Sequence, residues 1–229
     1  MHNQSFTSAV GQKFHPDGRV RTFPGNTIIS FVPPDSPIFA HTSWVQAQIQ
    51  ALPFAHKFGF LPPSSFHMTV MELLCDQVRV PERWSAQLPL DAPLAAMDAF
   101  FTERVPPIPP PGALRMRFVE VAQYTPTLNL MPDDEETAVS LQTYRNAITA
   151  ATGVRFPDHD SYQYHISTAY RLINLTAAEE DQLAATLQPI NATLRASFGL
   201  FAPPPPQLTF FDDMFAFYPV EQRHLLKTR

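Results

Sequence analysis

Hydrophobic positions along this chain alternate in some stretches and follow helical spacing in others, which predicts a series of short strands and helices. The first half reads as a strand over 27–32, a helix over 36–51, a strand over 64–74 and a helix over 92–104. The second half reads as strands over 113–122 and 125–131, a helix up to 153, a strand over 161–172, a helix from 176 and a hairpin over 208–218. The pattern therefore predicts two α+β halves of similar plan.

Local signals mark the ends of three of these helices. Ser36 is placed to cap the first one and Pro37 to occupy its first turn. Asp133 is expected to cap the helix that ends at Gly153, where a left-handed residue stops it. The sequence from Thr176 to Glu179 is a capping box for the last helix.

Proline is abundant in this chain, with 25 Pro against 7 Gly. The proline run over 105–112 is a semi-rigid spacer. It is the expected boundary between two lobes of a single domain that spans residues 1–229. Pro189 lies inside the pattern of the last helix and is expected to break or kink it.

Two of the predicted strands carry a histidine followed two residues later by a hydroxyl residue. These pairs are His67 with Thr69 and His165 with Ser167. Side chains at positions i and i+2 of a strand point to the same face, so each strand offers one imidazole and one hydroxyl to one surface. Alternation also places Met71 on the face of the first pair.

The bare motif is common here, since the chain has 8 His and a His-x-Ser/Thr sequence occurs at four of them. The motif at His41 falls in a predicted helix, where positions i and i+2 do not share a face. The motif at His159 lies between two aspartates in a polar, turn-like segment. Only His67 and His165 lie in apolar, strand-like runs, which makes them the candidate catalytic histidines.

Four further side chains are candidates for substrate binding. Alternation places Ser65 on the face of the first histidine and Gln163 and Arg171 on the face of the second. Arg79 follows the first histidine strand. A phosphate site benefits from a fixed cation, so Arg171 is the most useful candidate, and Arg79 could either reach the phosphate or lie on the surface. Tyr164 and Tyr170 fall on the opposite face and are expected in the core.

The paired histidines suit the hydrolysis of a cyclic phosphodiester. That reaction needs a base to activate water and an acid to protonate the departing oxygen, and imidazole titrates near neutral pH. Thr69 and Ser167 would donate hydrogen bonds to the non-bridging oxygens, where negative charge builds up in the transition state. Such a site needs no metal and no cofactor. The sequence leaves open which histidine is the acid.

Composition and charge limit the partners and the cellular location that we expect. Net charge of −5 argues against a protein that coats long nucleic acid, but a mononucleotide or an RNA end needs only a few local cations. No apolar run approaches the roughly 20 residues of a membrane span. The single cysteine, Cys75, is expected in the core and fits a reducing compartment, and Met1–Ser5 lacks the start of a secretory signal. We therefore expect a cytoplasmic monomer with a small substrate and no membrane partner.

The stretches Phe66–Val70 and Tyr164–Thr168 resemble the paired signature motifs of the 2H phosphoesterase superfamily, which includes RNA 2′,3′-cyclic phosphodiesterases and 2′,5′-RNA ligase-like proteins. The segments that resemble an uncharacterised branch of it are 11–14, 23–27, 61–65 and 157–160. Two positions depart from the pattern. Ser167 stands where threonine is commoner, and Thr168 stands where an apolar residue is usual.

This resemblance implies a bilobal, pseudo-symmetric α+β fold in which two lobes, each an antiparallel sheet with helices, flank a central cleft. It also implies metal-independent cyclic phosphodiesterase chemistry with His67, Thr69, His165 and Ser167 at the site. Two alternatives stay open. One is a silent module that binds a nucleotide or RNA end without turnover, and the other is a metal hydrolase that uses His159, the neighbouring aspartates and His165.

Overall fold

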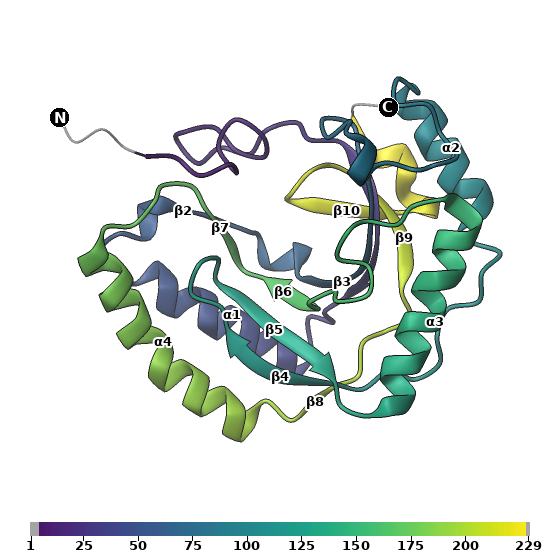
Figure 1. Ribbon diagram of the computed structural model, residues 1–229. Coiled ribbons are helices and arrows are strands. Elements are labelled where there is room, and N and C mark those ends of the chain that lie inside the picture. Colours follow the sequence, from purple (N-terminus) through teal and green to yellow (C-terminus); the bar gives the residue numbers. More distant parts are fainter. Residues whose placement is uncertain (1–4, 228–229) are drawn as a thin grey trace.

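The fold is built on one large, curled antiparallel sheet and one small sheet, seen in a computed structural model that describes residues 5–227 (Figure 1). Residues 1–4, which make up most of the segment Met1–Ser5 that lacks the start of a secretory signal, lie outside the described residues. The eight-stranded sheet has the order β10-β9-β1-β3-β6-β5-β4-β8, and β2 pairs with β7. The strands are β1 (Gly25–Phe31), β2 (Phe58–Phe60), β3 (His67–Cys75), β4 (Met116–Val121), β5 (Thr127–Pro132), β6 (His165–Ser167), β7 (Ala169–Arg171), β8 (Leu200–Phe201), β9 (Gln207–Asp213) and β10 (Ala216–Pro219).

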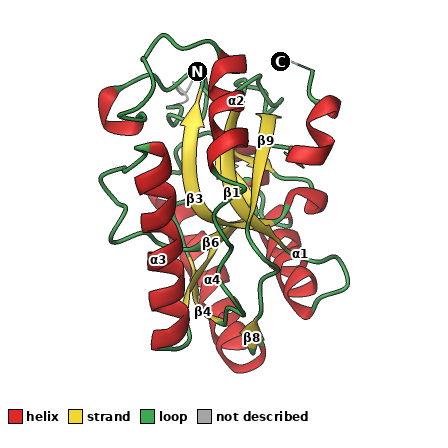
Figure 2. Ribbon diagram, turned by 90° about the vertical axis from the view of Figure 1, so that its right-hand side faces the viewer, coloured by secondary structure: helices red, strands yellow, loops and turns green. Residues whose placement is uncertain are grey.

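The helices pack in two pairs around this sheet. They are α1 (Pro37–Gln50), α2 (Leu94–Arg104), α3 (Glu135–Thr152) and α4 (Ala177–Ser197), with four short 3₁₀ helices at Ala55–Lys57, Pro63–Ser65, Pro81–Arg83 and Val220–Leu225. Helix α1 contacts α4, which lies against β4, whereas α2 contacts α3, which lies against β3 and β5. Figure 2 shows α1 and α3 on opposite sides of the strands. No helix within residues 5–227 is long and apolar enough to cross a membrane.

The two histidine strands are neighbours at the centre of the large sheet. The strand order is symmetrical about the junction of β3 and β6, with β1 beyond β3 on one side and β5 beyond β6 on the other. The predicted α+β plan of two similar halves is confirmed by this order. The 105–112 spacer connects α2 to β4, which belong to different halves. Because β9 and β10 return to the first half, that half is assembled from both ends of the chain.

Most predicted helix ends are correct. The Ser36 hydroxyl accepts a hydrogen bond from Phe39 N at 3.1 Å, Gly153 has a φ of 67°, and Thr176 forms its capping box. The cap of α3 is Asp134 and not the predicted Asp133, since Asp134 accepts the bond from Thr137 N at 2.7 Å. Asp133 instead pairs with Arg115.

Three further elements differ in part from expectation. Helix α4 continues through Pro189, so of the expected break or kink the break does not occur. The short strands β2 and β8 were not predicted, because three and two residues carry too little alternation to be recognised.

The second histidine strand divides at Thr168, where one strand was predicted over 161–172. Strand β6 pairs with β3 and β5, whereas β7 pairs with β2 in the small sheet. The chain passes from the large sheet to the small sheet at Thr168. The N–H of this residue bonds to Pro126 O at 3.2 Å, while its carbonyl accepts bonds from Leu61 N at 3.0 Å and Gln46 Nε2 at 2.8 Å. The side chain is fully buried, and its hydroxyl also donates to Pro126 O.

A β-bulge interrupts the first histidine strand just beyond its motif. Ile29 pairs with Thr69 and Ile28 pairs with Met71, so Val70 is the extra residue. The extra residue moves the side chains that directly follow it to the other face of the strand, and a second register shift between Glu72 and Cys75 limits this effect to a short stretch. Met71 is therefore 2% exposed in the core, contrary to the prediction from alternation, and Glu72 faces the cleft in its place.

Candidate active site

The two His-x-Ser/Thr pairs form a quadrilateral on one face of the sheet. Strands β3 and β6 are antiparallel, with Met68 paired to Ile166. Extending that register by one residue on each side sets His67 opposite Ser167 and Thr69 opposite His165. Each imidazole therefore has a hydroxyl across from it. The two histidines are diagonal neighbours on the strand pair, and residues in such positions lie roughly 7–8 Å apart.

Both imidazoles are held by the same kind of backbone hydrogen bond. His67 Nδ1 lies 2.6 Å from Ser65 O, and His165 Nδ1 lies 2.9 Å from Gln163 O. A carbonyl only accepts, so each Nδ1 carries the proton that makes this bond. That tautomer leaves Nε2 of each ring available to take up or release a proton.

Burial makes His67 a neutral group at physiological pH. The pKa of His67 is lowered to about 4, chiefly by burial and further by the charge of His165, while the bond to the Ser65 carbonyl opposes the shift. The ring also packs edge-on against Phe217, with ring centroids 4.3 Å apart. An imidazole that stays unprotonated in this way is suited to act as a base.

The lowered pKa predicts a loss of stability in acid. In the unfolded chain His67 takes up a proton below pH 6.5, whereas in the folded protein it does so only near pH 4. The free energy of unfolding should therefore fall as pH drops from 6.5 to 4, and the share of His67, screened by solvent, is about 2 kcal/mol. Urea unfolding of wild type and His67→Gln at pH 7 and pH 4 measures this share. An equal loss of stability in the two proteins would contradict the shift.

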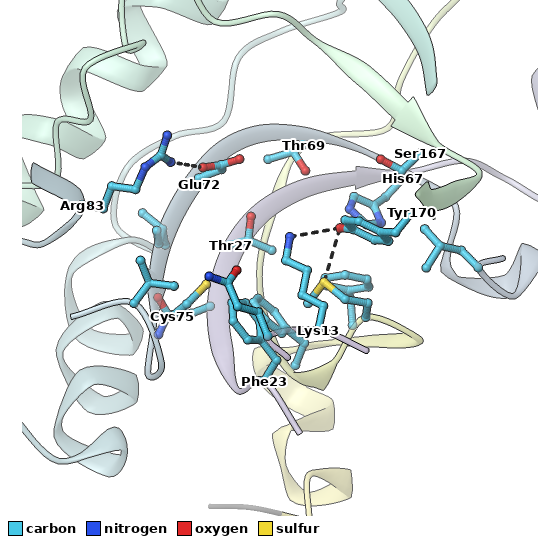
Figure 3. A pocket seen from close by; sticks show the side chains of 18 of the residues that line it. Lys13, Phe23, Thr27, His67, Thr69, Glu72, Cys75, Arg83, Ser167 and Tyr170 are labelled. Atoms are coloured by element: carbon cyan, nitrogen blue, oxygen red, sulfur yellow. Dashed lines mark hydrogen bonds and ion pairs between the residues drawn. The ribbon is translucent and has the colours of Figure 1, made fainter. Parts of the chain in front are cut away.

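The quadrilateral opens onto a cavity of about 410 Å³ that extends well beyond the two histidines (Figure 3). His67, Thr69, His165 and Ser167 all line it. The walls also include aromatic and apolar side chains from the N-terminal segment, from the segment after β2, from β3 and the loop after it, from the loop before β6, and from the β9–β10 hairpin. These are Phe23, Leu61, Leu73, Val78, Phe156, Phe211, Met214 and Phe217.

Arg171 and Arg79, the two predicted phosphate-binding arginines, do not line this cavity. Arg171 is buried on β7, where it pairs with Glu180 and donates from Nη2 to Gln123 O at 2.9 Å. The prediction failed because the strand divides at Thr168 and its later residues no longer continue the face of His165. Arg79 is held by Asp76 and by the Ala92 carbonyl.

Ser65 and Gln163 lie next to the site, but their side chains do not line the cavity. The Ser65 hydroxyl donates to Pro62 O at 2.7 Å, and Gln163 Nε2 donates to Leu130 O at 2.8 Å. The structure therefore places neither side chain at the cavity surface, where a substrate was expected to contact them. Their carbonyls instead orient the Nδ1 atoms of the two histidines.

Several residues of the cavity were not predicted to be there. Tyr170 lines the cavity and is not a core residue, whereas Tyr164 is buried as expected. Cys75 also lines the cavity, and burial raises the pKa of its thiol to about 12. Lys13, Glu72 and Arg83 are the charged additions. The only sequence signal for Lys13 was its place in the segment 11–14 that resembles the uncharacterised branch, and no signal marked the bulge that exposes Glu72.

The alternative metal site at His159 is not assembled in the structure. His159 is 3% exposed, and its Nε2 lies 2.9 Å from Asn146 Oδ1. Asp160 pairs with Arg155 at 2.6 Å. Within residues 5–227, no three His, Cys, Asp or Glu side chains lie close enough together to hold a metal ion.

Residues 13–126 match the family model "2H-phosphodiest: Domain of unknown function (DUF1868)". The matched stretch includes the motif at His67 and ends before the motif at His165. No curated protein matches the chain.

Two solved structures resemble the fold. The conserved protein of unknown function ATU0111 from Agrobacterium tumefaciens strain C58 has a TM-score of 0.88 and 24% sequence identity, over 94% of this chain and 92% of that one. The protein TT0787 of Thermus thermophilus has a TM-score of 0.45 and 14% identity, over 80% of this chain and 86% of that one. At 24% identity, the first likeness establishes the fold alone.

Proposed function

This chain belongs to the 2H-phosphodiest family through residues 13–126, and from that premise we propose that it hydrolyses a cyclic phosphodiester on a nucleotide or RNA end. The observation that carries the proposal is the matched pair of imidazoles on neighbouring strands. Each ring has its Nδ1 bound to a backbone carbonyl two residues earlier, which leaves Nε2 available, and both histidines line one cavity.

The lowered pKa of His67 assigns the roles in this proposal. His67 Nε2 takes a proton from water as the water oxygen attacks phosphorus. The bond between phosphorus and one ribose oxygen breaks, and the imidazolium of His165 gives its proton to that oxygen. The diagonal placement of the two rings across β3 and β6 suits the opposite approaches of an in-line displacement. Both histidines then exchange protons with solvent to regain their starting states.

Thr69 and Ser167 are assigned to the non-bridging phosphate oxygens. Each hydroxyl lies across the strand pair from the histidine of the other motif, so a phosphate between the two rings is also between the two hydroxyls. Donors placed where charge develops stabilise the transition state more than the substrate, and they act mainly on kcat.

Loss of either hydroxyl tests the proposal. Thr69→Val and Ser167→Ala should each lower kcat for a 2′,3′-cyclic nucleotide about 10²-fold, with a smaller change in KM. Thr186→Val, which removes an exposed helix hydroxyl that bonds Gln182 O, serves as the control and should keep full activity. Unchanged kcat in both cavity variants would show that these hydroxyls do not contact the reacting phosphate.

The same proposal includes the size of the substrate, the partners and the cellular location. A cavity of about 410 Å³ lies in the size range of small-molecule sites, which supports a small nucleotide or a short RNA end as the substrate. Net charge of −5 disfavours long nucleic acid as a partner, and the single cysteine fits a cytoplasmic location. We expect the protein to work as a monomer and without a cofactor.

A further inference from the structure

Lys13 projects into the cavity from a segment that is firmly attached to the core. Its neighbour Phe14 is fully buried, and the Phe14 ring packs 5.4 Å from the ring of Tyr170. Backbone bonds from Lys13 N to Ala9 O at 2.9 Å and from Arg21 N to Lys13 O at 2.8 Å fix the segment further. Figure 3 shows the side chain pointing into the hollow of the curved strands.

The Lys13 ammonium is held by neutral groups. Nζ lies 3.3 Å from the Tyr170 hydroxyl, 4.6 Å from the centre of the Tyr170 ring and 5.6 Å from that of Phe23. Lys13 takes part in none of the ion pairs formed within residues 5–227. A desolvated ammonium with hydroxyl and aromatic partners and no paired carboxylate retains the capacity to bind an anion.

The Lys13 ammonium meets groups of the cavity other than the two histidines. Its hydrogen-bond partner is the Tyr170 hydroxyl, and Figure 3 shows the side chain between Cys75 and Tyr170. Glu72 and Cys75 follow His67 along β3, beyond the bulge. The cavity therefore has a reaction end at the quadrilateral and a second polar end around Lys13.

The charge at this second end favours an anion. Lys13 and Arg83 contribute two cations, against the single carboxylate of Glu72, which Arg83 Nη1 contacts at 3.1 Å. Burial lowers the pKa of Lys13, but the Tyr170 hydroxyl, which accepts its hydrogen bond, and the Glu72 carboxylate act in the other direction, and the pKa lies above its ordinary value. The ammonium is therefore charged at neutral pH, and one positive charge at this end has no ion-pair partner among the described residues.

We propose that Lys13 binds a second anionic group of the substrate, a phosphate at a position other than the one that is hydrolysed. The substrate is then a nucleotide with two phosphates, such as a 2′,3′-cyclic nucleotide that also bears a 5′-phosphate. This inference rests on the proposed function for the reacting phosphate. It narrows the substrate class, because a nucleoside cyclic phosphate without the second phosphate would leave Lys13 without its anion.

Binding of product-like ligands tests the inference without turnover. Calorimetry with the four nucleoside 3′-monophosphates and the matching 3′,5′-bisphosphates compares wild type with Lys13→Met and Lys13→Arg. In wild type the second phosphate should tighten binding about 10- to 100-fold. Lys13→Met should lose this gain with little change for the monophosphates, and Lys13→Arg should keep most of it. Lys57→Met, which removes a lysine paired with Glu179 away from the cavity, is the matched control and should bind like wild type.

Three outcomes would overturn the inference. If Lys13→Met weakens the affinity for monophosphates and bisphosphates equally, Lys13 binds the reacting phosphate and not a second one. If Lys13→Met changes neither affinity, Lys13 does not contact the ligand. Failure of wild type to prefer the bisphosphates would exclude a second phosphate. If the cyclic phosphate is not hydrolysed but the bisphosphate preference depends on Lys13, the proposed reaction fails while the anion site stands. Thermal melts of each variant show that it is folded.

Discussion

Replacement of His165 by alanine is expected to lower hydrolysis of a 2′,3′-cyclic nucleotide about 10³-fold, because the ribose oxygen then departs without a proton. The same reasoning predicts that the loss depends on the leaving group. A 2′-deoxynucleoside 3′-(p-nitrophenyl phosphate), which has no 2′-hydroxyl to attack in place of water, releases p-nitrophenolate, which needs no general acid. His165→Ala should therefore retain most of the wild-type rate on this substrate, whereas His67→Ala should lose its rate on both, since each needs activated water.

Parallel assays of the two substrates with the two variants measure this difference. The folded state of each variant is checked by its circular dichroism spectrum and its melting temperature. If the two variants lose the same factor on both substrates, the assignment of His67 as base and His165 as acid is wrong. If only His67→Ala tolerates the aryl ester, the two roles are reversed.

Gly25→Ala is expected to destabilise the protein by about 2–3 kcal/mol through overpacking at the centre of the sheet. Gly25 lies on β1, between β3 and β9. A Cβ atom at this position would lie 2.6 Å from Leu74 O and 3.1 Å from the Cα of Cys75, which are backbone atoms that move only if β1 and β3 separate. It would also lie 2.7 Å from Cζ of Phe211, whose ring lines the cavity.

Gly112→Ala is the matched control for this substitution, because nothing lies within 4 Å of a Cβ atom built at Gly112. Urea unfolding of both variants gives the difference in free energy of unfolding directly. Equal stability of Gly25→Ala and Gly112→Ala would mean that β1 and β3 accommodate the added methyl group without strain.

The histidine strands could be predicted because their information is local. Apolar alternation around His67 and His165 identified two strands, and the i and i+2 rule placed a hydroxyl beside each imidazole. The structure then brings these strands together as neighbours. The alternation of residues along each strand does not show that β3 and β6 pair with each other. That pairing depends on which strands meet across the sheet, and here its prediction rested on a resemblance to a family.

The substrate-binding residues were mispredicted for a related reason. Alternation was extended through Val70 and through Thr168, but a bulge occurs at the first and a crossing between sheets at the second. Both are set by long-range hydrogen bonds, such as Arg145 Nη1 to Val70 O at 2.6 Å. Alternation along the strand alone therefore predicted, wrongly, that Arg171 lies in the cavity. It missed Lys13, which reaches the site from a segment far upstream of β3.

Phosphorus NMR of wild type and His67→Ala with a panel of 2′,3′-cyclic nucleotides, in excess chelator, is the most direct test of the central claim. His41→Ala is the control, since His41 has the same sequence motif but lies on α1, where it stacks on Phe198. We expect ring opening by wild type and His41→Ala and none by His67→Ala, and the product's phosphate position gives the regiochemistry. Equal turnover by His67→Ala, or none by wild type on any cyclic nucleotide or cyclic-phosphate RNA end, would contradict the claim, and the second result would favour a binding module.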